Sequence, residues 1–303
     1  MRFAKYNMTI YFCVNLERIS KLVNMENKIC IVTGANSGIG RVTAETLAKK
    51  GFNVLMVCRN KEKGLKALSE INERVKNASI ELFIVDFSSQ KDIRLVASEI
   101  KSKYPVIDVL VNNAGAVNEI RTETIDGLEN TFATNHLGYF LFTNLLLENL
   151  KAAPKARIVN VASEAQRIGK LNFDDLQSKL NYSPMKAYCQ SKLANIVFTY
   201  ELAKRLNGTN ITANCLHPGV VNTNFGKELK GFFKVVYFLF GKLQRSPEKG
   251  AETIIWLASS PEVEGITGKY FSDKKEIKSQ KDSYLETIQK QLWEVSEQLT
   301  IMK

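Results

Sequence analysis

Short apolar runs alternate with amphipathic stretches from residue 29 to the end of the chain. The runs are rich in Val and Ile and are apolar at nearly every position, which is typical of parallel strands covered on both faces. The stretches between them repeat their apolar residues with helical spacing. The runs that we expect to be strands are 29–33, 53–57, 80–85, 107–111, 157–161 and 211–216. The stretches that we expect to be helices are 39–50, 61–76, 89–103, 126–150 and 186–206.

Alternation of strands and helices predicts an α/β fold. Right-handed crossovers between the strands then give a doubly wound parallel sheet, the Rossmann fold, with helices on both faces. A short strand at 268–271 brings the expected number of strands to about seven, and 283–299 reads as an amphipathic C-terminal helix. Because no linker or internal repeat divides the chain, residues 25–303 are interpreted as a single dinucleotide-binding domain. Residues 1–24 are interpreted as an N-terminal extension of undetermined role, since Met25 directly precedes the first strand pattern.

The net charge of +11 attracts phosphorylated ligands. Basic residues are scattered among acidic ones and do not alternate with aromatic side chains, so we expect no nucleic-acid partner. The five cysteines form no CxxC pair, and with only His136 and His217 available we expect no metal site. Buried free thiols fit a reducing compartment, so a cytoplasmic location is expected. No stretch reaches the roughly 18 apolar residues of a membrane-spanning helix.

A glycine-rich turn follows the first predicted strand and opens a helix. Its glycines are spaced by four and then two positions, which lets the backbone turn tightly and approach a pyrophosphate at the helix N-terminus. The position inside a strand–helix–strand unit favours a nucleotide site over a purely structural turn. The residues that we expect to bind the cofactor here are Gly34, Asn36, Ser37, Gly38, Ile39 and Gly40.

The end of the second strand predicts which cofactor is bound. An NAD enzyme usually has an acidic residue there, to bind the ribose hydroxyls. This chain has Cys58 followed by Arg59, whose guanidinium suits a 2′-phosphate, so NADP(H) is the expected cofactor. The alternative is an exposed arginine at the start of the next helix.

Polar and small residues recur where the other predicted strands end. Because the carboxyl ends of parallel strands meet at one edge of a sheet, a ligand can lie across all of them. Any one of these residues is also a common turn former. Those that we expect at this edge are Asp86, Asn112, Asn113, Ala114, Gly115, Ser163, His217, Pro218 and Gly219.

A tyrosine followed four residues later by a lysine presents both side chains on one helix face. The pattern occurs at Tyr182, Tyr188, Tyr200 and Tyr270. Pro184 disrupts the first pair, the last runs into a polar loop, and Tyr200 lies roughly 18 Å along the helix from Tyr188. Tyr188 with Lys192 remains, on the helix that follows the strand ending near Ser163.

These three side chains suit proton and hydride chemistry at a carbonyl group. A phenol with a pKa near 10 needs a neighbour that favours the phenolate, and we expect the Lys192 ammonium to supply it. Ser163 would hydrogen-bond the substrate oxygen, while Tyr188 would donate or accept the proton.

The order of these motifs resembles the short-chain dehydrogenase/reductase family, and within it the retinol dehydrogenase-like branch. The resemblance spans about residues 28–273 and is carried by the glycine loop 33–40, by 112–115, by 134–138, by Ser163, by 188–192 and by 218–223. It implies that Ser163, Tyr188, Lys192 and Asn135 are the catalytic residues, and that Lys192 also binds the nicotinamide ribose. It further implies that Asp86 meets the adenine, that Asn113 lines the cofactor cleft, and that Val221 and Thr223 contact the carboxamide. Without the resemblance, Asn135 reads equally well as a polar helix residue.

Two departures from the family pattern affect what the resemblance implies. Ser163 precedes Tyr188 by 25 residues, a longer gap than in most of the family, although the retinol dehydrogenase-like branch shares it. That branch often has a membrane-spanning N-terminus, whereas none is evident here. Membrane residence and a retinoid substrate are therefore not implied.

Segment 223–246 is denser in apolar residues than one amphipathic face requires. We expect it to be a lid over a small lipophilic aldehyde, ketone or alcohol. A buried helix, a homodimer interface and a helix on a membrane surface are the alternatives. The sequence thus predicts an NADP-dependent oxidoreductase, and the alternative is a catalytically silent NADP-binding scaffold or redox sensor.

Overall fold

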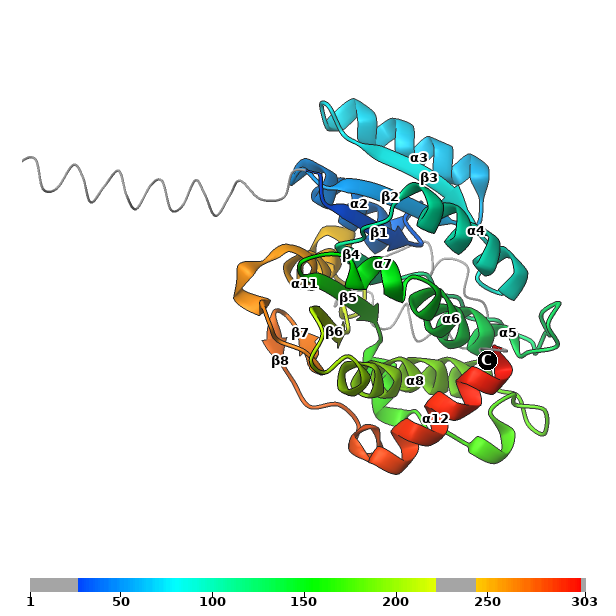
Figure 1. Ribbon diagram of the computed structural model, residues 1–303. Coiled ribbons are helices and arrows are strands. Elements are labelled where there is room, and N and C mark those ends of the chain that lie inside the picture. Colours follow the sequence, from blue (N-terminus) through cyan, green and yellow to red (C-terminus); the bar gives the residue numbers. More distant parts are fainter. Residues whose placement is uncertain (1–26, 222–243, 301–303) are drawn as a thin grey trace, which may run out of the picture.

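A computed structural model describes residues 27–221 and 244–300 of the chain. An eight-stranded sheet runs through its centre in the order β3-β2-β1-β4-β5-β6-β7-β8 (Figure 1). All neighbours are parallel except β8, which is antiparallel to β7. The strands are β1 (Ile29–Thr33), β2 (Asn53–Cys58), β3 (Ile80–Ile84), β4 (Val109–Asn112), β5 (Ala156–Val161), β6 (Ile211–Leu216), β7 (Tyr270–Ser272) and β8 (Lys275–Glu276).

The predicted doubly wound parallel sheet is confirmed, with one strand more than the expected seven. The added strand, β8, has two exposed residues. Such a strand has no apolar alternation, so the sequence pattern gives no sign of it. The strand expected at 107–111 begins at Val109.

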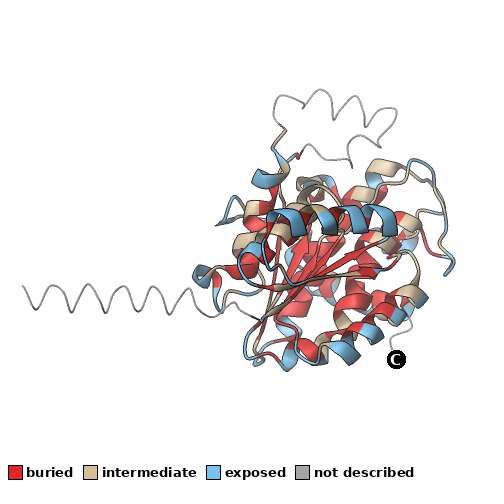
Figure 2. Ribbon diagram, turned by 90° about the horizontal axis from the view of Figure 1, so that it is seen from above, coloured by how far each residue is buried: buried red, intermediate tan, exposed pale blue. Residues whose placement is uncertain are grey.

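Helices cover both faces of the sheet, and Figure 2 shows the buried strands between them. Alternate residues of each strand point to opposite faces. Ile31 of β1 therefore packs in the core beneath α4, α6 and α8, and Val32 in the core beneath α2, α3 and α11. These helices and the C-terminal one are α2 (Gly38–Lys49), α3 (Lys61–Arg74), α4 (Gln90–Lys103), α6 (Gly138–Leu145), α8 (Pro184–Arg205), α11 (Pro247–Ser259) and α12 (Glu286–Leu299).

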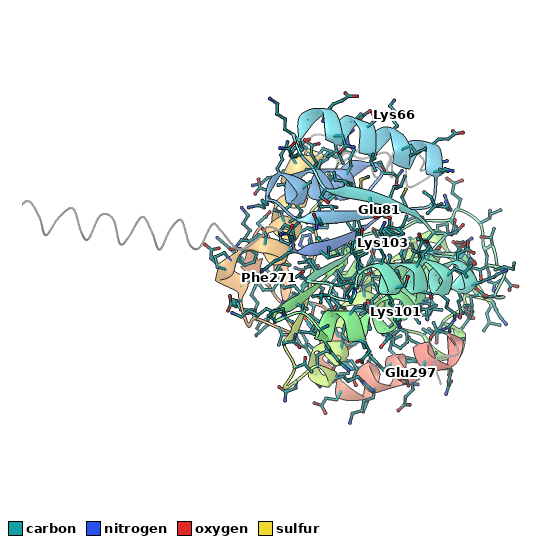
Figure 3. All side chains as sticks on the ribbon, turned by 45° about the horizontal axis from the view of Figure 1, so that its top comes forward. Lys66, Glu81, Lys101, Lys103, Phe271 and Glu297 are labelled. Carbon is teal, nitrogen blue, oxygen red and sulfur yellow. The ribbon has the colours of Figure 1, made fainter. Side chains whose placement is uncertain are left out.

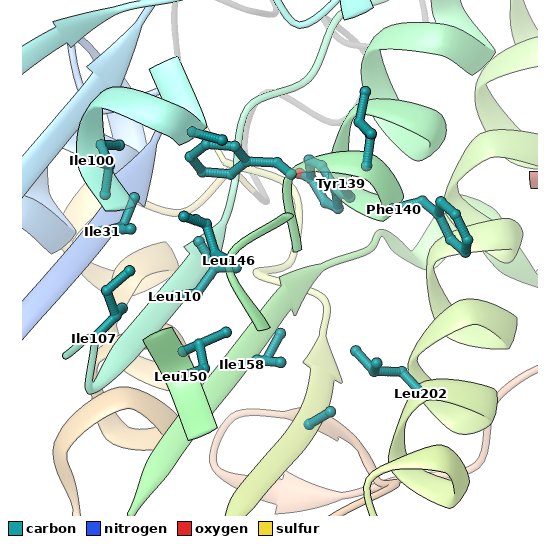
Figure 4. Packing of buried hydrophobic residues seen from close by; sticks show 14 of the residues in the cluster. Ile31, Ile100, Ile107, Leu110, Tyr139, Phe140, Leu146, Leu150, Ile158 and Leu202 are labelled. Carbon is teal, nitrogen blue, oxygen red and sulfur yellow. The ribbon is translucent and has the colours of Figure 1, made fainter. Parts of the chain in front are cut away.

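The first of these cores joins distant parts of the sequence (Figure 4). Ile31, Leu110 and Ile158 from three strands meet Leu146 and Leu202 from the helical layer. Burying a side chain of this size contributes about 1.5–3 kcal/mol relative to leaving it exposed. This packing holds the ends of neighbouring strands in register.

The prediction of a single helix over 126–150 is wrong. The structure has a short helix, a π-helical turn and two further helices there, and the chain before residue 130 is not helical. The buried carboxylate of Glu129 starts the first helix by accepting the backbone N–H groups of Thr131 and Phe132, both at 2.7 Å. The pieces are α5 (Asn130–Phe132), the π turn η1 (Ala133–Leu137), α6 and α7 (Leu147–Lys151).

Among the described residues, the other helical elements are short 3-10 turns: η2 (Glu164–Ile168), η3 (Phe173–Asp175), η5 (Pro261–Val263) and η6 (Lys281–Tyr284). Charged side chains of both signs cover the outer surface, as Figure 3 shows for Lys66, Lys101 and Glu297. Within the described residues, no helix has the length and apolar content needed to cross a bilayer.

Candidate active site

A cleft of about 360 Å³ lies beyond the carboxyl ends of the parallel strands. It runs across the ends of strands from both halves of the sheet, from β2 and β3 to β5 and β6. Its position is the usual ligand site of an open α/β sheet. The residues predicted from the sequence that line it are Gly34, Asn36, Ser37, Gly38, Ile39, Gly40, Arg59, Asp86, Asn113, Ala114, Gly115, Ser163, Tyr188, Lys192, Pro218, Gly219 and Val221.

The glycine loop between β1 and α2 is too tight for side chains. Gly34 and Gly38 have positive φ angles of 67° and 53°, which disfavour residues with a Cβ atom. A Cβ atom on Gly40 would lie only 2.3 Å from the carbonyl oxygen of Gly34. The glycines therefore allow α2 to begin directly against the loop.

The N-terminus of α2 is open to a ligand. Its N-cap residue Ser37 makes no side-chain hydrogen bond to the helix, and the first turn has no acidic residue. The caps of α3, α4 and α11 do accept such a bond, from Lys63, Asp92 and Lys249. The uncapped N–H groups and the helix dipole suit a pyrophosphate, so this end of the cleft fits a dinucleotide.

Asn113 holds the loop in place through its side chain. Its Nδ2 donates to the carbonyl oxygen of Thr33 at 2.8 Å. The Thr33 hydroxyl in turn accepts the backbone N–H groups of Asn113 and Ala114, at 2.8 and 2.9 Å. Thr33 was not among the predicted site residues, although its place at the end of β1 was a signal for it. Together these bonds tie the ends of β1 and β4 across the floor of the cleft.

Two cationic side chains lie at the end of the cleft that is formed by β2 and the start of α3. Arg59 is exposed, and Lys63, which sequence reasoning missed, lines the same region. Within the described part of the chain, neither forms an ion pair with an acidic side chain. The spacing of four residues, at the start of α3, was the available signal for Lys63. Burial raises the pKa of the neighbouring Cys58 to about 11, so that side chain remains a neutral thiol.

Asp86 follows β3 and also lines the cleft. One of its carboxylate oxygens accepts the backbone N–H of Ser88 at 2.9 Å and the Ser88 hydroxyl at 2.8 Å. These bonds fix the turn after β3 and orient the carboxylate at the cleft wall.

Ser163 and Tyr188 come together at the opposite end. Ser163 is the N-cap of η2, and its hydroxyl accepts the N–H of Ala165 at 3.3 Å. Tyr188 lies in the second turn of α8, which starts beside the end of β5. Burial raises the pKa of Tyr188 to about 12, while a hydrogen bond with Ser163 acts in the opposite direction.

Lys192 is 4% exposed and lies beneath these two groups. Its Nζ donates to the carbonyl oxygen of Val161 at 3.1 Å and is 5.7 Å from the centre of the Tyr188 ring. Burial lowers the pKa of this ammonium to about 8. The expected lowering of the phenol pKa by Lys192 is not seen, because Nζ is directed at the Val161 carbonyl and Ser163 is the group that lowers the pKa.

Asn135 lies behind the cleft wall, in the π turn η1. Its side chain accepts the N–H of Ala116 at 2.7 Å and donates to the carbonyl of Ala116 at 2.9 Å and to the Ser191 hydroxyl at 3.0 Å. A Cβ atom on Gly115 would lie 3.4 Å from the Asn135 oxygen and 3.5 Å from Nζ of Lys192. Asn135 thus joins the turn after β4 to α8, and π turns often occur at functional sites.

The other Tyr–Lys pairs lie away from the cleft. The Tyr182 hydroxyl donates to the carbonyl of Asn118 at 2.5 Å, and the Tyr200 hydroxyl pairs with Ser279 at 2.8 Å. Neither these nor Tyr270 line the cleft. Of the four tyrosines in these pairs, Tyr188 is the one that lines the cleft. Thr223, most of segment 223–246 and residues 1–24 lie outside the described residues.

Comparison with known proteins decides the family. The model of the short chain dehydrogenases matches residues 28–231. The chain belongs to the short-chain dehydrogenase family. It is 42% identical to human retinol dehydrogenase 14 and 41% identical to human retinol dehydrogenase 12, in both cases over 90% of this chain and 86% of the relative. It is also 40% identical to human polyprenol dehydrogenase, over 90% of this chain and 85% of the relative.

Solved structures agree with this short-chain dehydrogenase assignment. An uncharacterised protein from Mycobacterium paratuberculosis matches with a TM-score of 0.74 and 31% identity, over 92% of this chain and 96% of the other. A short chain dehydrogenase from Escherichia coli CFT073, solved in complex with NADPH, matches with a TM-score of 0.65 and 25% identity, over 82% and 97%. The chain is thus a retinol dehydrogenase-like oxidoreductase that uses a nicotinamide cofactor.

Proposed function

We propose that the protein is an NADP-dependent oxidoreductase that moves a hydride between nicotinamide and a lipophilic carbonyl or alcohol substrate. The observation that carries the proposal is the hydrogen-bonded pair of Ser163 and Tyr188 at one end of a cleft whose other end holds Arg59. The open N-terminus of α2 lies between them. This order suits a dinucleotide with its adenosine at Arg59 and its reactive ring near Tyr188.

The choice of NADP over NAD rests on charge. Arg59 and Lys63 place two cations where an NAD enzyme would offer a carboxylate, and a 2′-phosphate carries up to two negative charges. The NADPH complex of the Escherichia coli relative supports the same choice.

Each of the candidate catalytic residues has a distinct task in the proposed reaction. NADPH, when bound, supplies the hydride. Ser163 donates a hydrogen bond to the substrate oxygen, and Tyr188 gives that oxygen a proton as it becomes an alkoxide, or takes the proton back in the oxidation direction. The Lys192 ammonium lies 5.7 Å from the centre of the phenol ring and would bind the nicotinamide ribose, and Asn135 fixes the turn beside Lys192.

The proposed substrate class comes from the relatives. Retinol and polyprenol, which their printed names contain, are both long apolar alcohols. A lid at 223–246, contact with a membrane surface, a homodimer and a cytoplasmic location remain proposals from the sequence.

The proposal is tested by following the loss of NADPH absorbance with retinal, medium-chain aldehydes, a steroid ketone and a quinone, each compared with NADH. We expect turnover of at least one long apolar aldehyde, with NADPH strongly preferred. Tight NADPH binding without turnover of any carbonyl compound would favour the cofactor-binding scaffold. A preference for NADH would contradict the role given to Arg59.

A further inference from the structure

A histidine–carboxylate pair joins the two loops that flank the candidate catalytic end of the cleft. Nε2 of His217 lies 3.0 Å from a carboxylate oxygen of Glu164. Glu164 directly follows Ser163 after β5, and His217 directly precedes Pro218 and Gly219 after β6. Ser163, Pro218 and Gly219 all line the cleft, whereas the pair itself lies behind them. The pair therefore connects two walls of the site.

The two polar contacts of the His217 ring define its protonation state. Nδ1 of His217 accepts the backbone N–H of Gly219 at 3.2 Å. The proton of the neutral ring is then on Nε2, which faces Oε2 of Glu164 at 3.0 Å in a close polar contact rather than an aligned hydrogen bond. In this form, one imidazole holds both the loop of Ser163 and the backbone of Gly219.

Gly219 is held from its other side as well. Its φ angle is +81°, and a Cβ atom there would lie 2.7 Å from Nε of Arg245. The Arg245 guanidinium is paired with both carboxylate oxygens of Asp273. The backbone N–H of Arg245 donates to the carbonyl oxygen of Val220 at 2.8 Å. Gly219 is thus clamped between a ring nitrogen and an arginine side chain.

The charges facing His217 balance one another. The His217 side chain is 11% exposed, and its ring centre lies 5.8 Å from that of Tyr270. Burial lowers the pKa of His217, the two carboxylates raise it, and the two guanidinium groups lower it. The titratable and charged groups around it are Glu164, Arg167, Tyr270, Arg245 and Asp273. The neutral ring is therefore the resident form near neutral pH.

We propose that Glu164 and His217 are a positioning pair that fixes the Pro218–Gly219 wall of the cofactor cleft against the loop of Ser163. The inference rests on the proposed function, because it assumes that a nicotinamide cofactor occupies this cleft. A proton on Nδ1 removes the acceptor of the Gly219 N–H and releases that wall. Cofactor affinity consequently falls in acid, at a pH lower than the ordinary histidine pKa of 6.5, because the pKa of His217 is lowered.

Two substitutions separate the contact of His217 with Gly219 from its contact with Glu164. His217→Gln keeps a donor for Glu164 but has no acceptor near Nδ1, whereas His217→Asn keeps an acceptor for Gly219 but does not reach Glu164. We expect His217→Gln to weaken NADPH binding about fivefold at pH 7, which corresponds to the loss of one hydrogen bond. His217→Asn should weaken binding less than His217→Gln, because it keeps the acceptor for Gly219 and loses only the contact with Glu164. Neither variant should show the loss of affinity in acid that the wild type shows.

Glu164→Gln gives an independent test. It keeps an acceptor for Nε2 but removes the charge that raises the pKa of His217, so the acid loss of affinity should move to lower pH. Glu252→Gln, which removes the exposed partner of Lys249, is the control and should behave as the wild type.

The measurement is the NADPH dissociation constant between pH 5 and 8, from quenching of protein fluorescence. The inference is overturned if both His217 variants bind NADPH as tightly as the wild type at pH 7 and lose affinity in acid as the wild type does. If a His217 variant does not fold, Glu164→Gln decides the question. The proposed pair is contradicted if this variant loses NADPH affinity at the same pH as the wild type. Wild-type protein that binds no NADPH at any pH would contradict the proposed function itself.

Discussion

At the scale of single residues, burial has the largest effect on the acid–base properties of the site. It raises the pKa of Tyr188 to about 12 and lowers that of Lys192 to about 8. The phenol therefore holds its proton at neutral pH, which suits the donor role in reduction. Sequence reasoning identified both residues but expected the ammonium to set the phenol pKa. Spacing along a helix does not reveal where Nζ is directed.

The oxidation rate should therefore rise with pH. Tyr188 must lose its proton to act as a base, and below its pKa the deprotonated fraction grows about tenfold per pH unit. Ser163→Ala removes the hydrogen bond that lowers this pKa, so the whole profile should move to higher pH. Initial rates of alcohol oxidation between pH 7 and 10 check this. A plateau near pH 7 in the wild type, or an unshifted profile in the variant, would speak against it.

Arg59→Asp should invert the cofactor preference. The variant removes a charge-assisted partner of the 2′-phosphate and repels it, while the new carboxylate can accept the ribose hydroxyls of NAD. We expect kcat/KM for NADPH to fall by about ten- to hundredfold, with a gain for NADH. Lys66→Asp, on α3 but outside the cleft (Figure 3), makes the same charge change and should leave the ratio unaltered. An unchanged ratio in Arg59→Asp would defeat the assignment.

At the scale of elements, the strands were predictable and the helical region 126–150 was not. Each buried strand is a continuous apolar run, so its sequence alone marks it. The break in the helix depends on the buried Glu129 cap and on the bonds of Asn135 to Ala116 and Ser191, which are tertiary contacts. Sequence periodicity does not register such contacts, so Asn135 could be assigned only by family resemblance.

Gly40→Ala should separate α2 from the glycine loop. The added methyl group would lie 2.3 Å from the Gly34 carbonyl, so the helix must move. We expect a destabilisation of about 1–3 kcal/mol and loss of detectable cofactor binding, from thermal unfolding and fluorescence titration. Gly265→Ala meets open space but has a positive φ, so it isolates the backbone cost and should keep cofactor binding. Equal binding by both variants would contradict the role of the loop.

At the scale of the whole molecule, the C-terminal helix stabilises the layer that carries the candidate catalytic residues. α12 packs against α8 (Figure 1), and His136 of the π turn forms a hydrogen bond with Ser296 of α12 at 2.9 Å. The sequence predicted this helix but not its partner, since an amphipathic pattern does not say which surface it covers.

His136 makes the fold sensitive to acid. Burial lowers its pKa from 6.5 to about 3, so the unfolded chain takes up a proton that the folded chain refuses. Its contribution to stability is therefore complete above pH 6.5 and is lost as the pH falls toward 3, by about 1.4 kcal/mol per pH unit. His136→Gln keeps a donor for Ser296 and should flatten this part of the profile. Urea unfolding between pH 4 and 7 measures it, and parallel profiles would contradict the assignment.

The central claim is that Tyr188 exchanges the proton while the cofactor is held independently of it. The direct test compares Tyr188→Phe with Tyr200→Phe, since both tyrosines lie on α8 and precede a lysine by four residues. NADPH affinity and reductase turnover are measured on the same samples. We predict that Tyr188→Phe keeps NADPH affinity within about threefold but lowers turnover at least a hundredfold, while Tyr200→Phe retains both. Undiminished turnover in Tyr188→Phe would contradict the mechanism.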